Sequence, residues 1–166
     1  ITKVPLVCES CLFDLMVGDF KTRPDKAMGY AACEGAEKNN YQDGNFGVGT
    51  GATVGKFRGM DYCMKSGIGS YAVQIGELKV GAIVAVNALG DIYDHHSGRI
   101  VAGMLNEECS AFADTAKLLY SSYEVHDNKF VGNTTIGAII TNARFDKSQL
   151  SKIAGMAHNG YARSIR

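Results

Sequence analysis

The stretch that decides the fold class is Leu78-Lys-Val-Gly-Ala-Ile-Val-Ala-Val-Asn87. Its β-branched residues favour a strand, and the apolar residues on both of its faces are typical of a strand covered on two sides. Residues 67–76 are similar in composition and are separated from this stretch by Glu77 alone. The two runs therefore predict an antiparallel pair of strands, and residues 134–141 predict a further short strand.

The segments around these strands predict three helices. Pro24 and Asp25 suit the first turn of a helix whose small residues, at helical spacing, permit close packing. Asn106 is expected to cap a second helix over residues 107–120, and Asp146 to cap a third that buries one apolar stripe. The stripe consists of Leu150, Ile153, Ala157 and Tyr161. Because strands and helices mix without a repeated βαβ rhythm, we expect an α/β (α+β) fold.

The bulk composition excludes several classes of protein. The 166 residues fit a single domain, 1–166, and a hydrophobic content of 46% is enough for a packed core. Seventeen basic and seventeen acidic side chains cancel, which argues against nucleic-acid or membrane partners attracted by net charge. No apolar run approaches the ~20 residues of a membrane span.

The two ends of the sequence carry expectations of their own. The sequence opens on Ile1 without a Met, shows no basic-then-apolar leader, and closes on Arg166 within what looks like a helix. We therefore expect a cytoplasmic protein, and a piece of a longer polypeptide whose site lacks some members. Residues 4–17, which are apolar with breaks, predict a strand or a buried loop.

Two groups of residues suggest a metal or redox site, and the pattern is weak in both. Cys8-x-x-Cys11 has no second Cys-x-x-Cys to complete a four-ligand zinc site, so the five cysteines are expected to be structural, reduced thiols. His95 and His96 lie near Asp91 and Asp94, but polar residues in a turn are usually solvated. We expect neither a metal nor a cofactor.

A glycine-rich segment, Gly47-Val-Gly-Thr-Gly-Ala-Thr-Val-Gly-Lys56, is too rich in glycine for a regular element. It superficially suggests a phosphate-binding loop, but Phe57 follows the lysine where that motif requires Ser or Thr. Nucleotide binding is therefore a weak alternative. The glycines permit close approach of backbone to backbone and could hold Lys56 at a fixed point. The plainer alternative is a tight connection with a solvated lysine.

Three segments, taken in order, resemble the DmpA-like L-aminopeptidase/D-esterase family, which includes the nylon-oligomer hydrolases and β-peptidyl aminopeptidases. They are Phe46-Gly-Val-Gly-Thr-Gly-Ala-Thr-Val-Gly-Lys56, Val84-Ala-Val-Asn-Ala-Leu-Gly-Asp91 and Gly132-Asn-Thr-Thr-Ile-Gly-Ala-Ile-Ile-Thr-Asn-Ala-Arg144. Residues 13–30 and 157–166 are similar to the family's segments before the glycine-rich loop and after the nucleophile. The resemblance therefore spans nearly the whole chain.

The resemblance implies a four-layer α/β/β/α sandwich, of which this chain would be an incomplete portion. It also implies self-processing by cleavage between Asn133 and Thr134, so that residues 1–133 belong to an α-subunit-like portion and residues 134–166 begin a β-subunit-like portion. The nucleophile falls on Thr134, the supporting lysine on Lys56 and the site asparagine on Asn87. The implied partners are a peptide or amide small-molecule substrate and further copies, in a homo-oligomer of processed heterodimers. Family members carry additional residues before this region and an acidic segment beyond it.

These residue types suit amide hydrolysis by an N-terminal nucleophile. A threonine hydroxyl needs a nearby base, and the α-amine of an N-terminal Thr134, with a reference pKa of about 7.7–8.0, can serve. Lys56 would disfavour protonation of that amine through like charge, and Asn87 could donate to the oxyanion. The alternatives are a catalytically silent binding or assembly module of the same fold, and an ordinary Asn-Thr-Thr turn into a strand.

Overall fold

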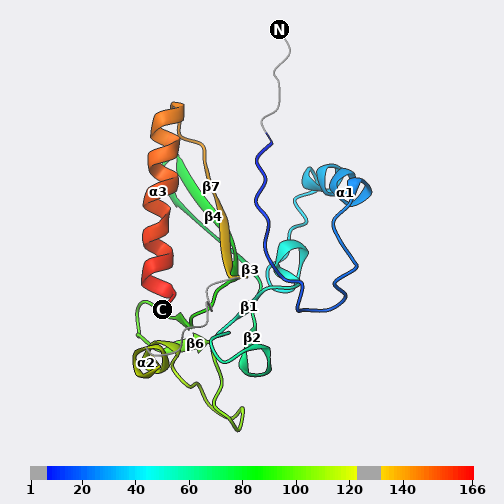
Figure 1. Cartoon of the computed structure of the whole chain (residues 1–166). Coiled ribbons are helices and arrows are strands. Elements are labelled where there is room, and N and C mark those ends of the chain that lie inside the picture. The colour runs from blue at the N-terminus through cyan, green and yellow to red at the C-terminus, as the bar shows by residue number, and fades with distance from the viewer. Residues whose placement is uncertain (1–6, 123–131) are drawn as a thin grey trace.

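The computed structural model describes residues 7–122 and 132–166. Its central feature is a sheet of three antiparallel strands, β3 (Ile68–Ile75), β4 (Leu78–Asn87) and β7 (Thr134–Thr141), with β4 in the middle (Figure 1). A tight turn at Gly76, where φ is +58°, joins β3 to β4. The expected antiparallel pair and the expected third strand are confirmed. The register between β4 and β7 sets Asn87 opposite Thr134.

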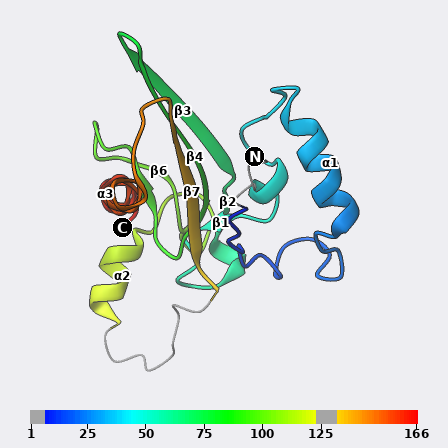
Figure 2. The same ribbon diagram turned by 90° about the horizontal axis from the view of Figure 1, so that it is seen from above.

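Helix α3 (Lys147–Ser164) lies along one face of this sheet (Figures 1 and 2). Asp146 caps it, and Gln149 returns the hydrogen bond in a capping box, as the position of Asp146 predicted. Of the expected stripe, Ile153, Ala157 and Tyr161 are half-buried, and Leu150 is exposed. The helix ends at Ser164, so the expectation that the chain closes within it is wrong. Ile165 instead forms an antiparallel bridge with Ile92.

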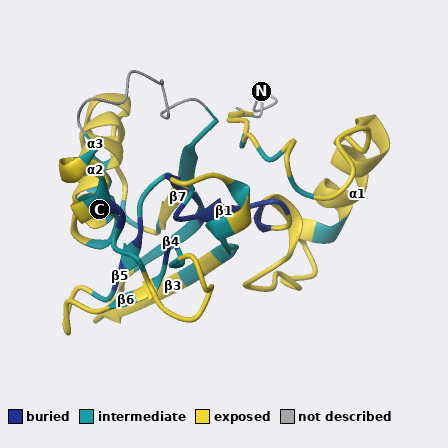
Figure 3. Ribbon diagram, turned by 60° about the horizontal axis from the view of Figure 1, so that its bottom comes forward, coloured by how far each residue is buried: buried dark blue, intermediate teal, exposed yellow. Residues whose placement is uncertain are grey.

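The end of the sheet far from Asn87 is open to solvent. Tyr71, Ile75 and Ile140 are 77%, 73% and 62% exposed, and β4 becomes buried only toward Asn87 (Figure 3). The expectation that β4 is covered on both faces along its length is therefore wrong for the described residues. Mixed α/β architecture is confirmed, as one helix-covered sheet with smaller antiparallel pairs around its buried end.

The core lies where several short elements cross the end of β4. The glycine-rich segment forms a 3₁₀ turn, Gly47–Gly49, and then β1 (Thr53–Val54), which pairs with β2 (Met64–Lys65). A second 3₁₀ turn, Met60–Tyr62, lies between these strands. The largest fully buried side chains are Met104, Val54, Asn87 and Asp91. Asn87, at the end of β4, is therefore part of this core.

The remaining elements lie around this core. β5 (Ile92–Tyr93) pairs with β6 (Ile100–Ala102), and helix α2 (Thr115–Ser121) follows. The second helix was expected over residues 107–120 with Asn106 as its cap, and that assignment is wrong. The Asn106 carboxamide oxygen accepts hydrogen bonds from the N–H groups of Ser110 and Ala111, which closes a turn instead. Asp114 caps the shorter helix that forms.

Helix α1 (Lys26–Ala36) begins after Asp25, whose side chain caps it, as predicted. None of its residues is buried, and it stands apart from the sheet (Figure 2), so the expected close packing of its small residues is absent. Of the segment 4–17, residues 7–17 form an irregular, largely exposed loop, and residues 4–6 lie outside the described part. No helix in the described ranges combines the length and apolarity that a bilayer crossing requires.

Candidate functional site

Lys56 is held at a fixed point by the glycine-rich segment and the residues after β4. The N–H of Gly55 donates to the carbonyl of Gly90 over 3.0 Å, and the N–H of Lys56 donates to that of Leu89 over 2.8 Å. Gly55 has φ of +70° and lies so close to the backbone of Met104 that a Cβ would collide with it. Both constraints require glycine, which accounts for the residue immediately before the lysine.

The Lys56 ammonium reaches Asn87 at the end of β4. Its Nζ donates to the side-chain Oδ1 over 2.7 Å and to the main-chain carbonyl of Asn87 over 3.2 Å. Asn87 is 1% exposed, so the contact is shielded from water on the asparagine side. Lys56 is therefore not the solvated surface lysine that the plainer interpretation of this segment predicted.

Two further neighbours determine the orientation of the Asn87 amide. Oδ1 also accepts hydrogen bonds from the N–H of Thr53, over 3.1 Å, and from its hydroxyl, over 3.3 Å. Nδ2 donates to the carbonyl of Phe13 over 2.6 Å and, more weakly, to that of Gly132 over 3.4 Å. Because one side of the amide meets donors and the other meets carbonyls, only this orientation satisfies both.

Thr134 begins β7 directly opposite Asn87. Residues paired in this way have side chains on the same face of the sheet, with Cα atoms roughly 4.5–5.5 Å apart. The chain enters the strand through Gly132, whose φ of +83° lies in the region that favours glycine. The fold thus brings Lys56 and Asn87 into direct contact and sets Thr134 beside them, with the Asn133–Thr134 bond at the strand entrance.

A cavity of about 160 Å³ adjoins this group. Its polar lining consists of Asp14, Thr53, Lys56 and Asn133, and the rest of the wall is mostly apolar. The apolar wall consists of Phe13, Met16, Val17, Met60 and Leu89. A polar corner within an apolar pocket is the common form of a small-molecule site. Asn133, the residue before the proposed cleavage point, therefore lines the same cavity as Lys56.

The environment of Lys56 changes its acid–base behaviour. Burial lowers the pKa of the Lys56 ammonium from 10.5 to about 8, and the nearby Cys63 partly opposes this shift. The pKa of the Cys63 thiol is raised, mainly by burial and against the effect of Lys56. An amine with a pKa near 8 is present in both protonation states around neutral pH, which suits proton transfer.

The glycine-rich segment does not have the features of a phosphate cradle. The Lys65 ammonium is bound by main-chain carbonyls: its Nζ donates to those of Gly49, Ala52 and Ser66 over 2.8–2.9 Å. The segment therefore turns carbonyl oxygens toward a cation, whereas a phosphate loop turns N–H groups toward an anion. The nucleotide-binding alternative gains no support from this geometry.

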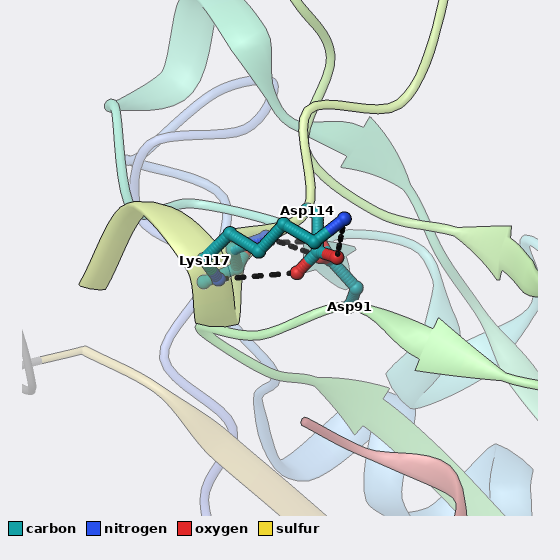
Figure 4. Close-up of polar contacts among 4 residues, drawn as sticks. Asp91, Asp114 and Lys117 are labelled. Carbon is teal, nitrogen blue, oxygen red and sulfur yellow. Dashed lines mark hydrogen bonds and ion pairs between the residues drawn. The ribbon is translucent and has the colours of Figure 1, made fainter. Parts of the chain in front are cut away.

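Asp91 and its neighbours form a structural cluster (Figure 4). The buried Asp91 carboxylate accepts hydrogen bonds from the N–H of Met104 and from the N–H and hydroxyl of Thr115, over 2.6–2.8 Å. It thereby fixes the start of α2, where Asp114 pairs with Lys117 over 3.3 Å. Within residues 7–122 and 132–166, no group of three or more potential ligands is arranged to hold a metal.

The metal and redox candidates from the sequence lie outside the lining of this cavity. Asp94 accepts hydrogen bonds from the N–H groups of His96 and Ser97, so this turn is stabilised by its own residues. Cys8 and Cys11 are exposed free thiols. Sequence reasoning missed Thr53 and the Phe13 carbonyl. For Thr53 a signal was present, since it is the polar member of an otherwise apolar buried triplet, Ala52-Thr53-Val54, three residues before Lys56.

Comparison with known proteins supplies the family. The sequence profile of peptidase family S58 matches residues 1–166. An uncharacterized aminopeptidase of Mycobacterium leprae (strain TN) is 34% identical over 167 residues, which cover 98% of this chain and 45% of the relative. A 6-aminohexanoate-oligomer endohydrolase of Paenarthrobacter ureafaciens is 28% identical over 166 residues, which cover 99% of this chain and 46% of the relative. The chain spans about half the length of these curated relatives. It belongs to peptidase family S58, as the resemblance implied.

Proposed function

We propose that this chain is part of a self-processing hydrolase of amide or peptide bonds, with Thr134 as nucleophile. The observation that supports this most is the Lys56–Asn87 contact of 2.7 Å at the end of β4, opposite Thr134 and beside a cavity that Asn133 lines. A half-buried lysine bonded to a buried asparagine beside an Asn-Thr junction supports a chemical role for the lysine. The relatives named as an aminopeptidase and an oligomer endohydrolase point to the same bond type.

Processing begins before any α-amine exists on Thr134, so another base is needed. Neutral Lys56, with its pKa of about 8, takes the proton from the Thr134 hydroxyl. Oγ attacks the carbonyl carbon of Asn133, the bond to the Thr134 nitrogen breaks, and that nitrogen takes a proton from Lys56. The product is an ester between Asn133 and Thr134. Water then hydrolyses the ester, which leaves a carboxylate on Asn133 and both a free amine and a free hydroxyl on Thr134.

Hydrolysis of a substrate amide reuses these groups. The α-amine of Thr134 serves as base for its own hydroxyl, and protonated Lys56 disfavours protonation of that amine. Asn87 Nδ2 has one strong hydrogen bond, to Phe13, and one long one, of 3.4 Å, toward Gly132. The second proton is the one that Asn87 can offer to an oxyanion. Thr134 Oγ attacks the substrate carbonyl carbon, the C–N bond breaks, and the leaving amine takes the proton that the α-amine had accepted. Water then hydrolyses the acyl ester on Thr134, which releases the acid and restores the free hydroxyl.

The test is substitution at Thr134 in the whole protein, read by intact mass. Thr134→Ala removes the nucleophilic hydroxyl and is expected to leave the chain uncut at this bond and without amidase activity. Thr134→Ser keeps the hydroxyl and is expected to retain cleavage. Circular dichroism checks that both variants fold. Cleavage of the alanine variant between residues 133 and 134 would remove Thr134 from its role.

A further inference from the structure

We propose that Thr53 is a positioning residue for the proposed reaction, acting through the Asn87 amide. The inference rests on the proposed function, because it assigns a further residue to that same site. Thr53 is 5% exposed and lines the cavity beside Lys56 and Asn133. Its side chain is thus the one buried hydroxyl that reaches the Lys56–Asn87 pair among the described contacts.

The position of Thr53 follows from the backbone around it. Thr53 lies in β1, where it pairs with Lys65, and the chain then turns through Gly55 so that Lys56 is tied to Leu89. Residues 53 and 56 therefore approach the end of β4 from one short, doubly anchored segment. Both direct their donors to the same acceptor, Asn87 Oδ1. The spacing of three residues between Thr53 and Lys56 thus lets both side chains reach one oxygen atom.

The consequence for Asn87 is a fixed amide plane. With Thr53 and Lys56 on the oxygen, and the Phe13 carbonyl on the nitrogen, the remaining Nδ2 proton can only face the Gly132 carbonyl. That carbonyl belongs to the residue before Asn133. Thr53 thus keeps the amide donor on the side of the peptide to be cut and leaves the lysine nitrogen against the oxygen. Without its hydroxyl, the amide has one fewer restraint against rotation.

Thr53→Val is the informative variant, because valine keeps the β-branched shape that suits β1. The oxygen of Asn87 retains the Lys56 and main-chain donors, so no buried acceptor is left unsatisfied. We expect the rate of self-processing to fall about three- to tenfold, the loss that one net hydrogen bond corresponds to. Thr53→Ser restores the hydroxyl and is expected to process within about twofold of the wild-type rate.

Thr115→Val is the matched control. Thr115 is 4% exposed, and its hydroxyl also donates to a side-chain oxygen that keeps another donor, Asp91 Oδ1 with the Met104 N–H. It lies in α2, outside the lining of the cavity. A buried threonine that serves only packing would behave alike at both positions, so Thr115→Val is expected to change the melting temperature without slowing processing.

The experiment follows appearance of the fragment that begins at Thr134, by gel and mass, during cell-free synthesis of the whole protein. Melting temperatures are measured on each purified variant. Slow processing in Thr53→Val, recovery in Thr53→Ser and wild-type processing in Thr115→Val support the inference. A wild-type rate in Thr53→Val, or equal slowing in Thr115→Val, overturns it. If Thr53→Val fails to fold, the Ser and Ala variants replace it, since they differ by the hydroxyl alone, and equal rates in this pair overturn the inference.

The two proposals fail separately. If Thr134→Ala is still cut at the Asn133–Thr134 bond, the proposed function is lost, whatever the Thr53 variants do. If Thr134→Ala stays intact and Thr53→Val processes at the wild-type rate, the nucleophile assignment holds and only the role of Thr53 is lost.

Discussion

At the scale of single residues, the hydrogen bonds and burial of the Lys56 nitrogen determine its acid–base behaviour. Two of its hydrogens are directed at Asn87, and burial shifts its pKa to about 8. Lysine suits this role because its amine can lose a proton in the neutral range once it is desolvated, whereas the guanidinium of arginine cannot. The identity of this residue, and not only its charge, should therefore matter for processing.

The rate of self-processing is expected to rise with pH through about 8 and then level off, because the neutral amine is the active form. Lys56→Arg keeps the charge but cannot supply a neutral base, so it is expected to process at least about a hundredfold more slowly, within the usual range for a lost general base. The measurement is the first-order rate of fragment formation from pH 6.5 to 9.5. A flat profile, or wild-type processing by the arginine variant, would contradict the role as base.

The same pKa shift links to stability with a definite sign. The folded protein binds the Lys56 proton more weakly than the unfolded chain, whose lysine titrates near 10.5. Between pH 8 and 10.5 the unfolded state therefore holds more protons, and the free energy of unfolding rises with pH. The destabilising effect of the half-buried ammonium is fully present below pH 8.

At the scale of elements, the glycine-rich segment, which includes β1, packs its main chain against neighbouring main chains near the end of β4. Gly49 approaches the backbone of Gly44 and Ile68, and Gly55 approaches that of Met104. Glycine at these points allows main chains to touch where any side chain would separate them. The segment therefore positions Thr53 and Lys56 by contact between backbones, which composition alone could only suggest.

Gly55→Ala is expected to destabilise the fold by more than about 2 kcal/mol and to abolish processing, because it adds strain at positive φ and a collision with backbone. Gly98→Ala is the matched control: its φ of +68° is close to that of Gly55, but no atom lies within 4 Å of the added Cβ. It should cost about 1 kcal/mol by strain alone. Chemical denaturation measures the free energy of unfolding of both variants. Equal losses would contradict the role of close backbone packing at Gly55.

The success of sequence reasoning differed between elements for physical reasons. The strands Leu78–Asn87 and Thr134–Thr141 were predictable because β-branched residues at their positions favour extended chain. The region 107–120 was not, because Asn106 satisfies a turn as readily as a helix start. The hydrogen bond from Thr53 to Asn87 joins residues 34 positions apart, so no local pattern encodes it.

At the scale of the whole molecule, the described residues leave apolar surface open at the far end of the sheet. Leu78 and Ile139 are exposed there in addition to Ile140. Large exposed apolar patches are typical of surfaces that pack against other protein. The homo-oligomer of processed heterodimers that the resemblance implied remains a prediction.

The residues after the proposed cleavage point are tied into the fold along their length. β7 pairs with β4 over eight positions, and Ile165 bridges Ile92 beyond α3. Cleavage before Thr134 would therefore break one covalent bond without removing a strand from the sheet. The two fragments are expected to stay associated under native conditions and to separate only in denaturant.

The central claim is most directly tested by the intact mass and N-terminal sequence of the purified, unmodified protein under denaturing conditions. Two fragments are expected to co-purify under native conditions, and the C-terminal fragment is expected to begin Thr134-Thr-Ile-Gly-Ala. Their masses should sum to that of the uncut chain plus one water. A single chain that stays intact after prolonged incubation at pH 8 to 9, or a new N-terminus at any residue other than Thr134, would contradict it.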